Sequence, residues 1–208
     1  MGELARSLRD LMRRNINRKS QERLVKQLNR QFTELAQLRR FATALVATYL
    51  TTSDKLTISN AGHPRPLWYQ ASARQWSFLV GPNDGQDGAL SNLPLGIDEA
   101  VSFAQTEIAL GHNDLVLFYT DALTETTDAT GKVLGEGRLL ALLNDLDATQ
   151  PARLGPDLIQ QLDLLREGKP PEDDFTFMLL SHNAGNSPRL TLRQKLDVYA
   201  KVFGLKSV

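Results

Sequence analysis

Two acidic sites flank strongly apolar segments, in positions where their carboxylates could hold a metal ion. Asp121 directly follows the run DLVLFYT, and the pair Asp173 and Asp174 directly precedes FTFMLLS. If these segments are neighbouring antiparallel strands, the end of one lies beside the start of the other. Parallel strands would instead separate the carboxylates by a strand length, roughly 20 Å at about 3.3 Å per residue. The antiparallel arrangement therefore predicts a cluster of carboxylates at one sheet edge.

Such a cluster requires compensation, because like charges repel unless a cation or bound protons offset them. Hard oxygen ligands favour magnesium or manganese over softer metals. A metal pair held by carboxylates suits phosphate ester hydrolysis, since it polarises phosphoryl oxygens and lowers the pKa of bound water. The alternative is that polar loops place acidic residues beside strands without any ligand, in which case Asp173 and Asp174 form a solvated turn.

The composition is that of an ordinary soluble domain and excludes several other chemistries. The 208 residues suffice for one domain with a sizeable core, and the formal net charge is zero, which gives no general attraction to nucleic acid or membranes. The absence of cysteine excludes disulfides, thiolate zinc sites and cysteine nucleophiles. No apolar run can span a bilayer, and the N-terminus lacks the features of a signal peptide, so we expect a cytoplasmic location and no membrane partner.

The basic N-terminal region, residues 1–40, is predicted to form amphipathic helices of the same domain. Apolar residues recur there at helical spacing, and Ser20 is a candidate cap for the second helix; the recurring residues are Leu4, Leu8, Leu11, then Leu24, Leu28, Phe32 and Leu35. The arginines and lysines are interpreted as solvated helix faces. Nucleic-acid binding is not expected, because no aromatic residues interleave with these charges.

The remainder reads as hairpins of alternating strands followed by helices, which predicts an α+β fold with mainly antiparallel sheets. In the second strand Leu56 and Ile58 are expected to face inward, and Thr57 and Ser59 outward. Expected strands are 41–50, 55–62, 66–70, 75–80, 101–110, 114–120 (buried on both faces) and 175–181, with a long loop at 81–96 and helices at 135–146, 156–168 and 189–205. Leu192, Leu196, Tyr199 and Phe203 are candidate anchors of the last helix.

Four segments in this order carry a family resemblance: NAGHPRPLWY at 60–69, LPLGI at 93–97, DLVLFYTDALTE at 114–125 and EDDFTFMLL at 172–180. Together they resemble the SpoIIE/RsbU-like branch of the PPM, or protein phosphatase 2C-type, family. The resemblance covers residues 20–182. It implies an α-β-β-α sandwich of two packed, mainly antiparallel sheets flanked by helices, with its core at 41–182 and a linker and helix at 183–208.

The resemblance also implies a site with two manganese or magnesium ions. Asp121 and Asp173 match metal-binding aspartates of the family, whereas Asp174 and Glu125 match neighbouring positions in the second shell or a turn. A further signature matches Asn60, Gly62 and His63. His63 could donate a proton to the leaving oxygen, but we favour the reading in which this segment shapes a turn.

Two departures from the family pattern bear on activity. Ala122 replaces the usual glycine, and the opening motifs with the remaining metal aspartates are not found, which makes the fold incomplete at the N-terminus. The expected function is metal-dependent hydrolysis of phosphoserine or phosphothreonine on a bacterial signalling regulator protein by a metal-activated water. The expected partner is this phosphorylated regulatory protein, with self-association or an upstream sensor domain as further partners. The alternative is a catalytically degenerate, phosphatase-like binding or regulatory module.

Overall fold

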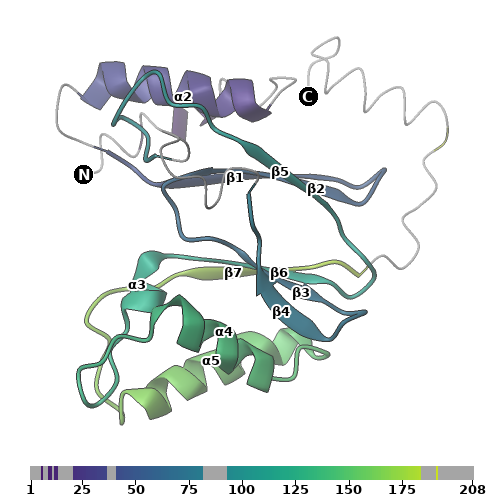
Figure 1. Cartoon of the computed structure of the whole chain (residues 1–208), viewed down its shortest axis with the longest axis vertical. Helices are drawn as coiled ribbons and strands as arrows, with labels where there is room; N and C mark the ends of the chain where they lie inside the picture. The colour runs from purple at the N-terminus through teal and green to yellow at the C-terminus, as the bar shows by residue number, and fades with distance from the viewer. Residues whose placement is uncertain are drawn as a thin grey trace. The chain divides into compact units, whose positions relative to one another are not determined.

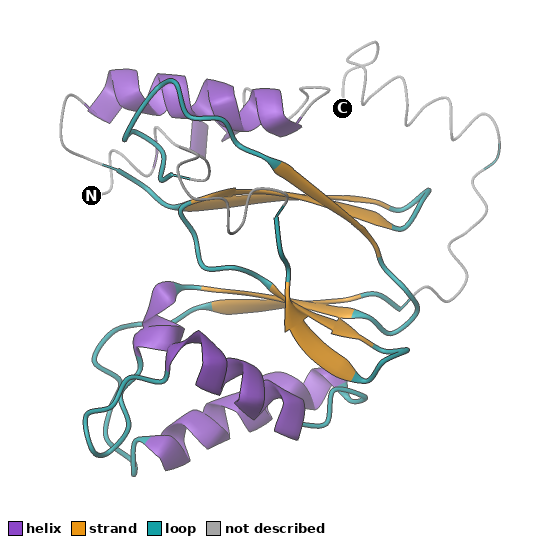
Figure 2. Ribbon diagram, in the orientation of Figure 1, coloured by secondary structure: helices purple, strands orange, loops and turns teal. Residues whose placement is uncertain are grey.

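The computed structural model describes residues 21–36, 41–81 and 93–183, with residues 6, 9, 10, 12, 13 and 191 as single positions. These residues form two antiparallel sheets with flanking helices (Figures 1 and 2), which confirms the predicted α+β class. The sheets belong to two compact units, one built mainly from residues 21–63 and 93–109 and the other from 64–80 and 110–183. Of the predicted first helix, residues 6, 9, 10, 12 and 13 are described, and all five are helical. The predicted last helix apart from residue 191, the Ser20 cap and most of the loop 81–96 lie outside the described residues.

The first unit contains a three-stranded sheet in the order β1-β2-β5, in which both neighbouring pairs are antiparallel. Its strands are β1 (Ala44–Leu50), β2 (Lys55–Ala61) and β5 (Gln105–Ala109). The turn between β1 and β2 includes Asp54 at φ 53°, a left-handed conformation that aspartate tolerates better than most residues. The predicted hairpin is therefore confirmed.

Helix α2 (Gln21–Ala36) packs its apolar side into the core of this unit. Leu28 and Phe32 are buried, as the helical spacing predicts, whereas Leu24 is half-buried. Phe32 shares one cluster with Val25, which was not predicted, and with Ala61 of β2. The charged residues lie on the opposite side, where Arg30 and Glu34 form an exposed ion pair at 3.6 Å. The basic residues of α2 thus form a solvated face.

The prediction that Ser59 faces solvent is wrong, because its side chain is fully buried. Ser59 lies on the same face of β2 as Ala61, two residues along, and α2 packs against that face. β2 is also the central strand, so its backbone is paired on both sides. Leu56 and Ile58 on the other face are buried as expected.

The second unit contains a four-stranded antiparallel sheet in the order β4-β3-β6-β7. Its strands are β3 (Leu67–Gln70), β4 (Gln75–Phe78), β6 (Leu115–Tyr119) and β7 (Phe177–Ser181). All five residues of β6 are buried, which confirms the prediction for this continuous apolar run. The β3–β4 hairpin turns at residues 71–74, also as predicted.

Helices α4 (Gly135–Asp145) and α5 (Pro151–Leu165) pack their apolar sides against this sheet (Figure 1). α5 begins five residues before the predicted start at Pro156, because Pro151 occupies the first turn, where a missing N–H costs nothing. A short helix, α3 (Asp121–Glu125), directly follows β6 and was not predicted. None of the helices in the described part of the chain is long and apolar enough to cross a membrane.

Candidate metal site

The two predicted metal aspartates are brought together by the pairing of β6 with β7. These strands are antiparallel neighbours, and their register ends with Tyr119 opposite Phe177. Asp121 lies two residues beyond this pair on one strand, and Asp173 lies four residues before it on the other. The antiparallel arrangement that the sequence reasoning required is therefore present, and both carboxylates belong to the same edge of the sheet.

The ladder continues one step beyond β6 and β7, through Thr120 and Thr176. The Thr120 N–H donates to the Thr176 carbonyl at 2.9 Å, and the Thr176 N–H donates to the Thr120 hydroxyl at 2.9 Å. The same hydroxyl donates to the Thr176 carbonyl at 3.3 Å. These bonds tie the segment that precedes Asp121 to the segment that follows Asp174.

Each of the two aspartates is exposed and uses one oxygen in a local hydrogen bond. Asp121 Oδ1 accepts the N–H of Ala122 at 3.0 Å, and Asp173 Oδ1 accepts the N–H of Asp174 at 2.7 Å. Neither carboxylate forms an ion pair within the described part of the chain. Their solvent-facing oxygens have the hard-donor chemistry that magnesium and manganese prefer.

The described residues supply only part of a metal coordination shell. No three His, Asp or Glu side chains among them lie close enough to hold an ion together. Two carboxylates fit the chemistry of magnesium, which commonly binds one or two carboxylates and keeps several waters. They do not by themselves fix a pair of ions.

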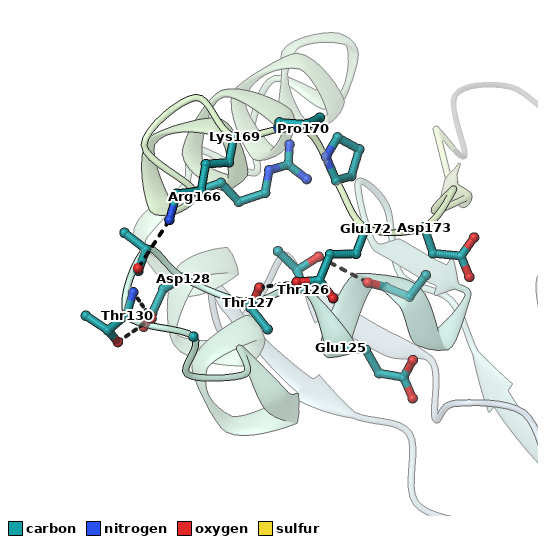
Figure 3. Close-up of a pocket in the computed structure, with 14 residues that line it drawn as sticks. Glu125, Thr126, Thr127, Asp128, Thr130, Arg166, Lys169, Pro170, Glu172 and Asp173 are labelled. Carbon is teal, nitrogen blue, oxygen red and sulfur yellow. Dashed lines mark hydrogen bonds between the residues drawn. The ribbon is translucent and has the colours of Figure 1, made fainter.

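A cavity of about 570 Å³ opens beside Asp173, between residues 122–131 and residues 166–173 (Figure 3). Glu125 and Glu172 contribute to its wall, and the Thr127 hydroxyl donates to Glu172 Oε1 across it at 3.0 Å. In Figure 3, Glu125 and Asp173 come from the two different segments that border this cavity. The candidate site thus has a recess beside Asp173.

Asp128, on another part of the cavity wall, accepts four hydrogen bonds. Its Oδ1 accepts the Thr130 hydroxyl at 2.6 Å and the backbone N–H groups of Thr130 and Lys132 at 3.0 Å each. Its Oδ2 accepts from Arg138 at 3.0 Å. The hydroxyl of Thr130, followed by the Lys132 N–H, holds the pKa of Asp128 well below its ordinary value. Asp128 is thus a structural carboxylate and is not available to a metal.

The sequence reasoning missed Arg166, a buried cation on the cavity wall. Its guanidinium is paired with Asp163 and lies 5.9 Å from the ring centroid of Phe175. Its Nε and Nη1 atoms are buried and find no hydrogen-bond partner within the described residues. The segment LREGK gives no period or motif that would have distinguished this arginine from a solvated one.

The second predicted group, Asn60, Gly62 and His63, belongs to the first unit and forms a turn. Asn60 Oδ1 accepts the N–H of His63 at 2.8 Å, and Asn60 Nδ2 donates to the His63 carbonyl at 2.7 Å. His63 Nδ1 lies 3.2 Å from the Thr43 hydroxyl. Asn60 therefore caps the turn that His63 enters, in line with the turn reading of this signature.

Ala122 tolerates its position without strain. It is the second residue of α3 and does not have a positive φ. Helical backbone suits alanine better than glycine, so the departure from the family glycine costs nothing in local conformation.

Three solved structures share this fold. The RsbU and RsbW domains of Rv1364c from Mycobacterium tuberculosis match with 23% identity and a TM-score of 0.69, over 96% of this chain and 55% of that chain. The phosphatase domain of SpoIIE from Bacillus subtilis matches with 13% identity and a TM-score of 0.56, over 89% and 76%. The SiaA-PP2C domain of Pseudomonas aeruginosa matches with 13% identity and a TM-score of 0.69, over 86% and 68%. The chain thus has the PP2C-like phosphatase fold, and it spans about half the length of the Rv1364c structure.

The sequence comparison identifies the family. The family described as Stage II sporulation protein E (SpoIIE) matches residues 1–183, and the chain belongs to this family. The resemblance inferred from the four motifs is therefore confirmed. A comparison with curated proteins finds no match.

Proposed function

We propose that the chain contributes to metal-dependent hydrolysis of phosphoserine or phosphothreonine on a bacterial signalling regulator protein. The observation that carries this proposal is the antiparallel pairing of β6 with β7, which sets Asp121 and Asp173 at one sheet edge. Membership of the SpoIIE family supports the same reading.

In this proposal Asp121 and Asp173 hold the metal through their solvent-facing oxygens, and Asp174 and Glu125 flank it. The chemistry that manganese or magnesium supplies when bound is polarisation of the phosphoryl oxygens and activation of a water molecule. The cavity beside Asp173 receives the peptide that flanks the phosphorylated residue. Asn60, Gly62 and His63 shape a turn and carry no proton in the reaction.

The proposed partner is a phosphorylated regulatory protein. The related structure from Mycobacterium tuberculosis combines RsbU and RsbW domains in one chain, which supports a setting among regulatory proteins. We further propose, from the sequence, that self-association or an upstream sensor domain regulates the chain.

One observation favours a second function, that of a binding module. The described residues hold no cluster of three metal-ligating side chains. A phosphatase-like domain with an incomplete site would recognise a phosphorylated protein without hydrolysing it.

Hydrolysis of p-nitrophenyl phosphate and of a phosphoserine peptide, with and without millimolar manganese, tests the proposal. Manganese-dependent turnover that is lost in Asp121→Asn combined with Asp173→Asn, and kept in the control Asp145→Asn, is expected. Asp145 suits the control because it is an exposed carboxylate at the end of α4. No turnover from a folded chain that still binds the phosphopeptide would contradict the enzyme proposal and favour the binding module.

A further inference from the structure

The chain leaves a sheet and enters a helix across the single residue Thr120. Tyr119 is the last residue of β6, and Asp121 is the first of α3. The backbone of Thr120 must therefore satisfy two elements whose hydrogen-bonding directions differ. How it does so decides where the Asp121 carboxylate lies relative to β7.

The backbone bonds of Thr120 are divided between the two elements. Its N–H donates to the Thr176 carbonyl, as in an antiparallel ladder. Its carbonyl would accept the Thr176 N–H if the ladder continued regularly, but it instead accepts the Leu123 N–H of α3 at 3.0 Å. The Thr176 N–H has thus lost its regular backbone acceptor.

The Thr120 hydroxyl replaces that missing acceptor. It lies 2.9 Å from the Thr176 nitrogen and 3.3 Å from the Thr176 carbonyl oxygen. A hydroxyl has one donor and two acceptor positions, so it can make both bonds at once. The strand pair therefore stays closed for one residue after the backbone of β6 has turned away.

This use of the hydroxyl departs from the usual role of threonine at a helix start. Thr120 is the N-cap residue of α3, where a threonine side chain normally accepts an N–H from the first turn. Here the side chain makes no cap hydrogen bond to the helix. The cap is left unmade, and the hydroxyl is directed across the sheet to the strand that carries Asp173 and Asp174.

We propose that Thr120 is a positioning residue, whose hydroxyl holds the Asp173–Asp174 segment beside Asp121. We call the two hydrogen bonds between the Thr120 hydroxyl and Thr176 the hydroxyl clamp. Its role in metal binding rests on the proposed function above, whereas the existence of the clamp does not. Thr176 is exposed, so water can take over its N–H when the hydroxyl is removed. Loss of the clamp therefore loosens the relative placement of the two aspartates without unfolding the sheet.

Thr120→Val and Thr120→Ser distinguish the effect of the hydroxyl from the effect of the side-chain shape. Valine keeps the branched shape and removes the hydroxyl, whereas serine keeps the hydroxyl. Thr149→Val is a matched control, because the Thr149 hydroxyl also makes a side-chain hydrogen bond, to Asp147 at 2.6 Å, but at the start of α5.

Amide hydrogen exchange of the 208-residue chain tests the clamp without any metal. In Thr120→Val the Thr176 amide should exchange about tenfold faster, which is the effect of losing one hydrogen bond. Amides of Phe118 and Met178, which lie opposite each other two residues further into the β6–β7 ladder, should keep their wild-type rates, and Thr120→Ser and Thr149→Val should match the wild type at Thr176. An unchanged Thr176 amide in Thr120→Val would overturn the proposal.

Manganese titration, followed by paramagnetic broadening of amide signals near Asp121 and Asp173, tests the consequence. Thr120→Val should weaken manganese binding by about tenfold, the lower end for residues that orient metal ligands, and Thr120→Ser should restore it. Equal affinity in all variants would refute the positioning role. If the wild type binds no manganese, the metal function fails, and the exchange rate of the Thr176 amide still decides whether the clamp exists.

Discussion

Gly62 lies so close to Pro94 that no side chain fits between them. A Cβ at position 62 would lie 2.5 Å from Pro94 Cγ and 2.8 Å from Pro94 N. Gly62 also has a φ of 68°, where residues with a Cβ are strained. The contact joins the NAGHP segment to the LPLGI segment, which are far apart in the sequence.

Gly62→Ala should destabilise the chain by about 2–4 kcal/mol, the sum of left-handed strain and overpacking. The clash involves a proline ring and backbone nitrogen, neither of which can swing away as a flexible side chain would. Urea unfolding followed by circular dichroism measures the change.

Gly137→Ala is the matched control for this substitution. Gly137 lies within α4, and a Cβ there would meet no atom within 4 Å. Alanine is the better helix former, so the free energy of unfolding should rise by about 0.5–1 kcal/mol. Equal effects of the two substitutions would contradict the special role of the Gly62–Pro94 contact.

Asp114 is a buried carboxylate that joins the start of β6 to the β3–β4 hairpin. It accepts hydrogen bonds from Trp68 Nε1 at 3.1 Å and from the N–H groups of Ala71 and Gly111, both at 2.9 Å. Asp114→Ala leaves these donors without an acceptor and should cost about 2–4 kcal/mol. Urea unfolding followed by tryptophan fluorescence measures the loss, since Trp68 is one of the donors. Asp145→Asn, at an exposed position, should change stability by less than about 0.5 kcal/mol.

The sequence predicts the strands of both sheets because their signal is local. Alternation, turn residues and the apolar run of β6 are all contained within single segments. The position of Asp121 beside the Asp173 segment follows from one further assumption, that β6 and β7 are antiparallel. Once this pairing is granted, the candidate site needs no other long-range information.

Three residues whose surroundings escaped prediction are Ser59, Thr120 and Arg166, and each depends on what packs against it. Ser59 is polar in an alternating strand, yet α2 covers its face. Thr120 is predicted to be the last residue of the strand 114–120, yet its backbone enters α3 and its hydroxyl bonds to Thr176 on another strand. Arg166 reads as a solvated helix terminus but is buried beside Phe175. In each case the partner lies outside the residue's own strand or helix, so no pattern within that element reports it.

Replacement of tyrosine by phenylalanine should have opposite effects on stability at positions 119 and 49. The Tyr119 hydroxyl is buried and has no hydrogen-bond partner within the described residues, whereas the Tyr49 hydroxyl donates to Asp54 Oδ1 at 2.8 Å. Tyr119→Phe removes a desolvated, unpaired group and should stabilise the chain by about 1 kcal/mol. Tyr49→Phe removes a made hydrogen bond and should destabilise it by a similar amount. Thermal or urea unfolding of both variants gives the signs, and destabilisation by Tyr119→Phe would show that its hydroxyl is paired.

Tyr49 also predicts a loss of stability at alkaline pH. Burial, followed by the hydrogen bond to Asp54, raises the pKa of Tyr49 to about 12 from an ordinary value of 10.0. The folded state therefore holds the proton more tightly than the unfolded state, so the contribution is complete below pH 10 and is lost as the pH rises toward 12. Urea unfolding at pH 9 and pH 11.5 should show this loss in the wild type, and a smaller loss in Tyr49→Phe. An identical decline in both would assign the alkaline sensitivity to other groups.

The lowered pKa of Asp128 should make stability depend on pH in the opposite sense, with a loss at acid pH. Its pKa is held below the ordinary value of 3.8, first by the Thr130 hydroxyl. The contribution of Asp128 to stability is therefore present above about pH 4, the range of an unperturbed aspartate. It is lost as the pH falls through the lower folded-state pKa.

An NMR titration of the Asp128 carboxyl carbon should place its midpoint below those of ordinary aspartates, and Thr130→Val should move the midpoint upward. Lys132 and Arg138 would still donate to the carboxylate in this variant, so only part of the shift should disappear. A midpoint unchanged by Thr130→Val would show that the backbone and Arg138, and not the hydroxyl, set the charge state of this cavity wall.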